Sequence, residues 1–106
     1  MSALGKKLRR LEGGRIAFWC PGCKCAHQVR INPDVGSGPV WMWNQCTDAV
    51  TLEPSVHVNP PGPYHRSNVV VCHSFVREGR IQFLTDSTHP LKGQTVPLPD
   101  FPASAA

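Results

Sequence analysis

Two cysteines separated by a Pro-Gly pair, Cys20-Pro21-Gly22-Cys23, constrain the fold of this chain more than any other feature of its sequence. Pro and Gly favour a bent backbone that turns both sulfurs the same way, and two thiolates on a tight turn form half of a tetrahedral zinc site. A redox Cys-x-x-Cys pair would instead be expected at a helix start within a βαβ pattern, and no such pattern surrounds this one. The spacing predicts a small fold stabilised by a bound metal.

The length and the cysteine count agree with that prediction. A chain of 106 residues has room for one domain, and so small a domain buries a modest core, so a metal would help it fold. The five cysteines are an odd number with no signal-peptide pattern before them, which favours a reducing, cytosolic compartment over a disulfide framework. No stretch approaches the roughly 20 apolar residues that cross a bilayer, so we expect a soluble protein that does not enter a membrane.

The positive charge is concentrated at the N-terminus. The net charge is +4, and from residue 16 onward six Lys or Arg balance six Asp or Glu. A basic arm can bind phosphates, which makes nucleic acid a candidate partner, although a solubilising tail has the same composition. The residues concerned are Lys6, Lys7, Arg9, Arg10 and Arg15.

Three segments are predicted along the chain. Residues 1–14 are a flexible basic arm, either disordered or a short amphipathic helix, because Leu4, Leu8 and Leu11 have helical spacing. Residues 15–102 form a zinc-stabilised β domain, and residues 103–106 are a tail. Within the domain, strand-like runs at 16–19 and 27–31 read as a hairpin with the cysteine turn at its tip, and further β-rich segments follow at 40–43, 52–58 and 95–98.

The clearest element is a hairpin between Val69 and Leu84 with Glu78-Gly79 as its turn. Gly at the second turn position permits the positive φ that a two-residue hairpin needs, and the resulting register puts Val76 opposite Ile81. Eleven prolines and nine glycines among short β-branched runs argue against a helical bundle. We therefore predict a small all-β domain of antiparallel hairpins, similar to a zinc ribbon.

Cys20 and Cys23 are the predicted anchor ligands of a zinc ion, and Cys72 is the predicted third, because it lies on the inward face of the hairpin. Adjacent strand residues point to opposite faces, so at most one of Cys72 and His73 is expected to ligate. The fourth ligand is taken as His89. His27, His73 and Cys25 are the alternatives.

A second group of polar and aromatic residues lies at strand ends around the same hairpin. Trp43, Asn44, His73 and Asp86 are predicted to line a pocket, in which His73 and Asp86 are candidates for acid-base catalysis or for holding a hydrolytic metal. The alternative is purely structural: the Asp86-Ser87-Thr88 run also suits a turn or helix cap, and the tryptophans suit a core.

Several strings of the sequence resemble a family of short bacteriophage and prophage proteins, some of which carry an ammonia monooxygenase label. The label has no support in this chain, which lacks a membrane span and a copper-type histidine cluster. The resemblance implies a phage origin, action in the cytoplasm of an infected or lysogenic bacterial host, and a zinc set of Cys20, Cys23 and Cys72 with one histidine. It rests on Phe18 to Cys23, Trp41 to Asn44, Glu53-Pro54-Ser55, Cys72 to Leu84 and Thr88 to Pro99, with family counterparts also at His27 and Asp86.

Two functions from different classes fit these features. The first is a zinc-stabilised interaction module that binds a host or phage protein. The alternative is a small zinc-dependent hydrolase or nucleotide-processing enzyme with an open metal position and His73 or Asp86 as base. Nucleic-acid binding through the basic arm is a third, weaker hypothesis.

Overall fold

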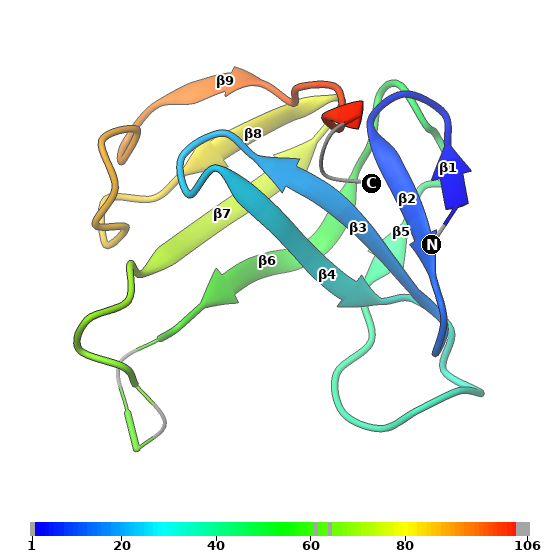
Figure 1. Ribbon diagram of the computed structural model, residues 1–106, viewed down its shortest axis with the longest axis horizontal. Helices are drawn as coiled ribbons and strands as arrows, with labels where there is room; N and C mark the ends of the chain where they lie inside the picture. The colour runs from blue at the N-terminus through cyan, green and yellow to red at the C-terminus, as the bar shows by residue number, and fades with distance from the viewer. Residues whose placement is uncertain (1, 61, 64, 104–106) are drawn as a thin grey trace.

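The structure is a computed structural model that describes residues 2–60, 62–63 and 65–103. No α-helix occurs in these residues, which confirms the all-β prediction. Their nine strands are drawn in Figure 1: β1 (Ser2–Leu4), β2 (Leu8–Leu11), β3 (Arg15–Cys20), β4 (Cys25–Arg30), β5 (Met42–Trp43), β6 (Leu52–Val58), β7 (Cys72–Arg77), β8 (Arg80–Phe83) and β9 (Thr95–Pro97).

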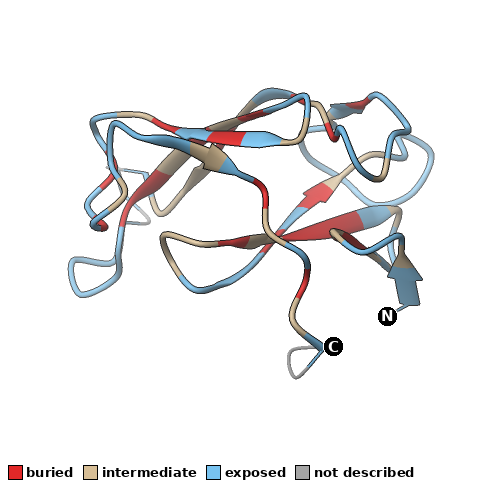
Figure 2. Ribbon diagram, turned by 90° about the horizontal axis from the view of Figure 1, so that it is seen from above, coloured by how far each residue is buried: buried red, intermediate tan, exposed pale blue. Residues whose placement is uncertain are grey.

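The strands form two antiparallel sheets that pack face to face. One sheet has the order β1-β2-β3-β4 and the other β5-β6-β7-β8-β9, so within each sheet the strands pair in sequence order. Figure 2 shows the two layers, with buried stretches on both. Their inner faces share one hydrophobic core, since successive strand residues alternate between the two faces of a sheet. The core includes Leu8, Ile16 and Phe18 from the first sheet and Leu52, Val76, Ile81 and Phe83 from the second.

Both predicted hairpins are present. β3 and β4 pair from Arg15↔Arg30 to Cys20↔Cys25, with the cysteine turn at the tip. β7 and β8 pair with Val76 opposite Ile81, as the turn chemistry predicted. Gly79 has a φ of 77° and Glu78 a φ of 50°, so both turn residues have a left-handed backbone conformation. The strand begins at Cys72, three residues later than the start of the predicted hairpin.

The N-terminal arm is the main correction. Residues 1–14 were expected to be a short helix or disordered, but β1 and β2 lie there and extend the first sheet by two strands. Leu8 pairs with Phe18 and is fully buried. The leucine spacing is compatible with a helix, yet pairing with β3 buries Leu8 in the shared core, and tertiary packing overrides a weak local preference.

The C-terminal end packs back on the N-terminal strands. The backbone N–H of Phe101 donates to the carbonyl of Lys6 at 2.8 Å, and Phe101 is buried. Of the predicted tail, residues 104–106 lie outside the described residues. Over the part of the chain that the structure describes, no helix is long and apolar enough to cross a membrane.

Candidate active site and metal centre

The cysteine turn places two sulfurs at one end of the shared core. The turn is closed by a backbone hydrogen bond of 2.8 Å from Lys24 to Cys20, and Lys24 is left-handed with a φ of 56°. The backbone N–H of Cys23 donates to the sulfur of Cys20 at 3.3 Å. Hydrogen bonds within the turn therefore position both thiols without contacts from distant residues.

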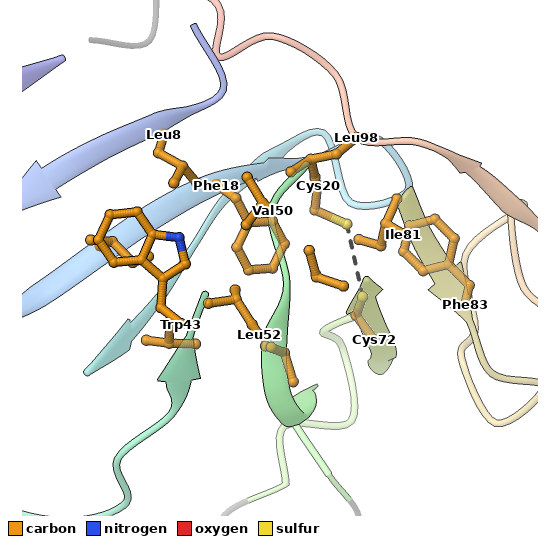
Figure 3. Close-up of a cluster of buried hydrophobic side chains, with 14 residues drawn as sticks. Leu8, Phe18, Cys20, Trp43, Val50, Leu52, Cys72, Ile81, Phe83 and Leu98 are labelled. Carbon is orange, nitrogen blue, oxygen red and sulfur yellow. Dashed lines mark hydrogen bonds between the residues drawn. The ribbon is translucent and has the colours of Figure 1, made fainter. Parts of the chain in front are cut away.

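Four predicted ligands come together at this turn. The ligand atoms of Cys20, Cys23, Cys72 and His89 all lie within 4.8 Å of one another. The Sγ atoms of Cys20 and Cys72 are 3.8 Å apart and bridge the two sheets, as Figure 3 shows. Cys20, Cys72 and His89 are buried, and Cys23 is half-buried. Three thiols and an imidazole at this separation can hold a metal ion.

The imidazole of His89 reaches the turn because residue 22 has no side chain. A Cβ atom on Gly22 would lie 2.3 Å from Cε1 and 2.5 Å from Nδ1 of His89. The ring also packs edge-on against Phe83 at 4.4 Å between centroids. Its Nε2 atom is buried and has no hydrogen-bond partner within the described residues. Buried polar atoms are rarely left without a partner, so this nitrogen marks a place for one.

The three thiols of the cluster differ in their pKa values. A hydrogen bond with Cys72 is the main cause that lowers the pKa of Cys20 to about 4. The same hydrogen bond, followed by burial, raises the pKa of Cys72. Burial, followed by the charge on Cys20, raises the pKa of Cys23 to about 12. One thiolate thus forms readily while two thiols resist ionisation, and a bound cation would stabilise all three as thiolates.

The remaining ligand alternatives lie around this cluster. His27 is buried on β4, its Nε2 has no partner among the described residues, and it forms a separate group with Cys23 and Cys25. Cys25 is an exposed residue, but partial burial of its sulfur raises the pKa of its thiol. His73 belongs to a different group, on the other face of β7 from Cys72. The structure thus groups His89 with the three predicted cysteines.

His73 instead lies between a serine and an aspartate. Its Nε2 is 2.9 Å from Oγ of Ser55, and its Nδ1 is 3.0 Å from Oδ2 of Asp86. With the proton on Nδ1, His73 donates to Asp86 and accepts from the Ser55 hydroxyl, which is the hydrogen-bond order of a catalytic triad. The hydrogen bond from His73 is the main cause that lowers the pKa of Asp86, which therefore stays ionised at neutral pH.

A second imidazole covers the ring of His73. His57 stacks on it with 4.0 Å between centroids and 7° between planes. Its Nε2 lies 3.9 Å from Oδ2 of Asp86 and has no hydrogen-bond partner within the described residues. Burial, followed by the charge of His73, lowers the pKa of His57 and keeps this ring neutral. The stack limits the orientations that the ring of His73 can adopt.

Local backbone features position the three groups. Ser55 lies in β6, where the pairing register with β7 shifts between Leu52 and Val56, and such irregularities re-aim side chains. Ser87 is buried and holds the backbone of His73: its Oγ accepts from the N–H at 3.0 Å and donates to the carbonyl at 3.1 Å. Beside His73 and Asp86 opens a depression of about 430 Å³, also lined by Gln82, Leu84 and Gly93.

Two residues of the predicted pocket have other surroundings. Trp43 is a core residue whose Nε1 donates to the carbonyl of Cys46 at 3.0 Å. The side chain of Asn44 is hydrogen-bonded to the backbone of residues 46, 49 and 51. The depression beside His73 and Asp86 is lined by neither residue. Trp43 and Asn44 therefore serve the packing and the loop after β5.

Some of the basic residues of the N-terminal arm contact other parts of the protein. Lys7 forms an ion pair of 3.6 Å with Asp100, and the guanidinium of Arg9 lies 4.6 Å from the ring centre of Phe101. Arg15 donates to Gln28 at 2.6 Å, whereas Arg10 and Lys6 are exposed. Nucleic-acid binding through these five residues stays a prediction.

Sequence reasoning missed Ser55 as a functional residue. Glu53-Pro54-Ser55 stood out only as part of the family resemblance, and no spacing links Ser55 to His73 and Asp86. A triad is recognised by geometry and not by sequence position, so only the fold reveals it. His73 and Asp86 were named as candidates for acid-base catalysis beside a structural alternative, and their side chains lie together.

Fold and site together define a class: small β proteins of two sheets that carry a serine–histidine–aspartate arrangement on one face and a cluster of metal-ligating residues beneath it. The chain belongs to the family described as bacterial ubiquitination-like system serine protease (BubE), whose model it matches over residues 5–84. No match was found among curated proteins or among solved structures.

The family match includes the cysteine turn, Ser55 and His73 and ends before Asp86 and His89. The family is described by a bacterial system, whereas the sequence resemblance implied bacteriophages and prophages. The phage origin, and with it the host cytoplasm, stays a prediction.

Proposed function

We propose that this protein is a serine hydrolase that cleaves acyl bonds of proteins within a bacterial ubiquitination-like system. The observation that carries the proposal is the hydrogen-bonded chain of Ser55, His73 and Asp86, at 2.9 Å and 3.0 Å. The family description names the same chemistry, a serine protease. The proposal keeps His73 and Asp86, each a candidate base in the hydrolase hypothesis, and adds Ser55 as a nucleophile that needs no metal.

The geometry assigns a step to each group. Ser55 Oγ attacks the substrate carbonyl while His73 Nε2 takes its proton, and the carbonyl oxygen becomes an oxyanion. His73 then returns the proton to the leaving amine as the carbon–nitrogen bond breaks, which leaves an acyl group on Ser55. A water molecule, deprotonated by His73, attacks this ester, and His73 returns that proton to Ser55 Oγ as the carbon–oxygen bond breaks and the acid is released. Asp86 holds the imidazole in its tautomer and stabilises the imidazolium that forms in both halves.

The metal centre has a separate role in this proposal. Three cysteines and one histidine are the ligands of closed, structural zinc sites, so we assign zinc to Cys20, Cys23, Cys72 and His89. The ion would join the two sheets beneath β7 and support the strand that carries His73. The interaction-module hypothesis shares this structural ion, but it gives no reason for the hydrogen-bonded order of Ser55, His73 and Asp86.

Labelling with a fluorophosphonate probe, which modifies activated serines, tests the proposal. We expect one label per chain, located at Ser55 by mass spectrometry, and turnover of an activated aryl ester. Ser55→Ala should remove the label and lower turnover by at least about 10³-fold while the circular dichroism spectrum is unchanged. Labelling that persists in Ser55→Ala, or no labelling of the folded wild-type protein, would contradict the assignment.

A further inference from the structure

Two arginines face each other on the outer surface of the β7–β8 hairpin. Arg77 and Arg80 are the last paired residues before the turn. Residues directly opposite each other in an antiparallel pair point to the same side of the sheet. Both arginines are exposed. Like charges directly opposite each other in an antiparallel pair destabilise it, so the hairpin carries this pair at a cost.

No carboxylate within the described residues forms an ion pair with either guanidinium; the ion pairs there involve Asp100 and Asp86. Glu78 is the nearest acid along the chain, in the turn itself, where its backbone N–H donates to Thr51 Oγ1 at 2.9 Å. The positive charge of the Arg77–Arg80 pair is therefore open to a partner from outside.

Arg77 is held on the face that carries the triad. Its guanidinium lies over the ring of Phe75, 4.0 Å from the ring centre, and that ring lies 6.5 Å from the ring of His73. Phe75 lies between Ser74, the partner of Val56, and Val76, the partner of Leu52, so it faces the irregular part of β6 that contains Ser55. Stacking on an aromatic ring orients a guanidinium, and its edge stays free to bind a carboxylate in the forked geometry that arginine favours.

We propose that the Arg77–Arg80 pair binds an acidic side chain of the substrate, within a few residues of the bond that Ser55 attacks. This inference rests on the proposed hydrolase function. A substrate segment lying along the outer face of β7 passes His73, Phe75 and Arg77 in order, because alternate strand residues share a face. An acidic residue beyond the scissile bond then meets the guanidinium while the carbonyl meets Ser55.

A series of 4-nitrophenyl half-esters, from succinate to suberate, tests the proposal. Each half-ester carries a terminal carboxylate at a different distance from the reacting carbonyl and is compared with the neutral alkanoate ester of the same chain length. We expect kcat/KM to favour the half-ester at one or two lengths. The double variant Arg77→Gln/Arg80→Gln should lower that preference by about threefold to tenfold, the range for one or two solvent-exposed ion pairs.

The controls separate this inference from the proposed function. Arg77→Lys should retain part of the preference, and Arg10→Gln, which removes the same charge from the other sheet, should retain all of it. The neutral esters should be hydrolysed equally by all of these variants. Turnover of neutral esters with no half-ester preference at any length would overturn the Arg77–Arg80 site alone. If the wild-type protein hydrolyses none of these esters, the proposed hydrolase function is wrong.

Discussion

Gly22 is the residue that leaves room for the imidazole of His89 beside the cysteine turn. A methyl group there would overlap the imidazole of His89, with 2.3 Å to Cε1 and 2.6 Å to Nε2. The ring cannot retreat easily, because Phe83 packs against it. The close approach, and not an unusual backbone angle, is what requires glycine at this position.

We expect Gly22→Ala to displace His89 and weaken metal binding. A ligand moved out of position typically costs about 10- to 100-fold in metal affinity. Competition with a chromophoric chelator measures the change. Cys25→Ser is the matched control, since Cys25 lies at the same turn outside the four-residue cluster. Equal affinities of Gly22→Ala and the control would contradict the assignment of His89 as a ligand.

Individual site residues differed in how well the sequence predicted them. Cys20 and Cys23 belong to one turn, so their convergence is a local property that spacing reveals. Cys72 followed from the alternation of a strand whose turn was recognisable. Ser55 did not, because its position depends on a register shift between β6 and β7 that no local pattern encodes. Trp43 and Asn44 were grouped with His73 by their chemical type and by their expected places at strand ends, neither of which specifies a spatial contact.

The first two strands show where element prediction failed. Leu4, Leu8 and Leu11 have the spacing of a helical face, and the same residues equally suit strands beside β3. The choice between helix and strand is decided by the edge of β3, which is free to pair, and by the core, which Leu8 helps to fill. Both are properties of the folded domain. By contrast, the hairpins at the cysteine turn and at Glu78-Gly79 were predictable because their turns specify the pairing locally.

We expect deletion of residues 1–14 to destabilise the whole domain, contrary to its expected role as a dispensable arm. The deletion removes Leu8, which is fully buried, and replacing one buried leucine with alanine already costs about 2–5 kcal/mol. The melting temperature should fall by at least about 10 °C. Calorimetry measures it, and Lys6→Gln/Arg10→Gln, which removes charge but keeps both strands, should melt like the wild type. A truncated protein with an unchanged melting temperature would restore the view of a separate arm.

At the scale of the molecule, the four candidate metal ligands come from both sheets. Cys20 and Cys23 come from the β3–β4 hairpin, Cys72 from β7, and His89 from the segment between β8 and β9. An ion held by these residues would restrain two layers whose inner faces otherwise meet mainly through apolar side chains. Structural zinc contributes directly to folding free energy.

We expect metal removal to lower thermal stability and ester turnover together. Treatment with 1,10-phenanthroline should shift the melting curve down and abolish turnover, and added zinc should restore both. The non-chelating isomer 1,7-phenanthroline controls for non-specific effects of the compound. Loss of turnover without a change in melting temperature would indicate instead that the metal takes part in the reaction.

The adjacency of Cys72 and His73 has a consequence for how this chain can vary. One side chain points into the core and the other out to the solvent, so β7 has two incompatible sets of neighbours. A one-residue insertion or deletion in β7 would reverse every side chain beyond it. Depending on its direction, such a one-residue slip would bring either His73 into the thiol cluster or Cys72 into the place beside Ser55. Substitutions in β7 can be judged one at a time, but a change in its length would remove both centres at once.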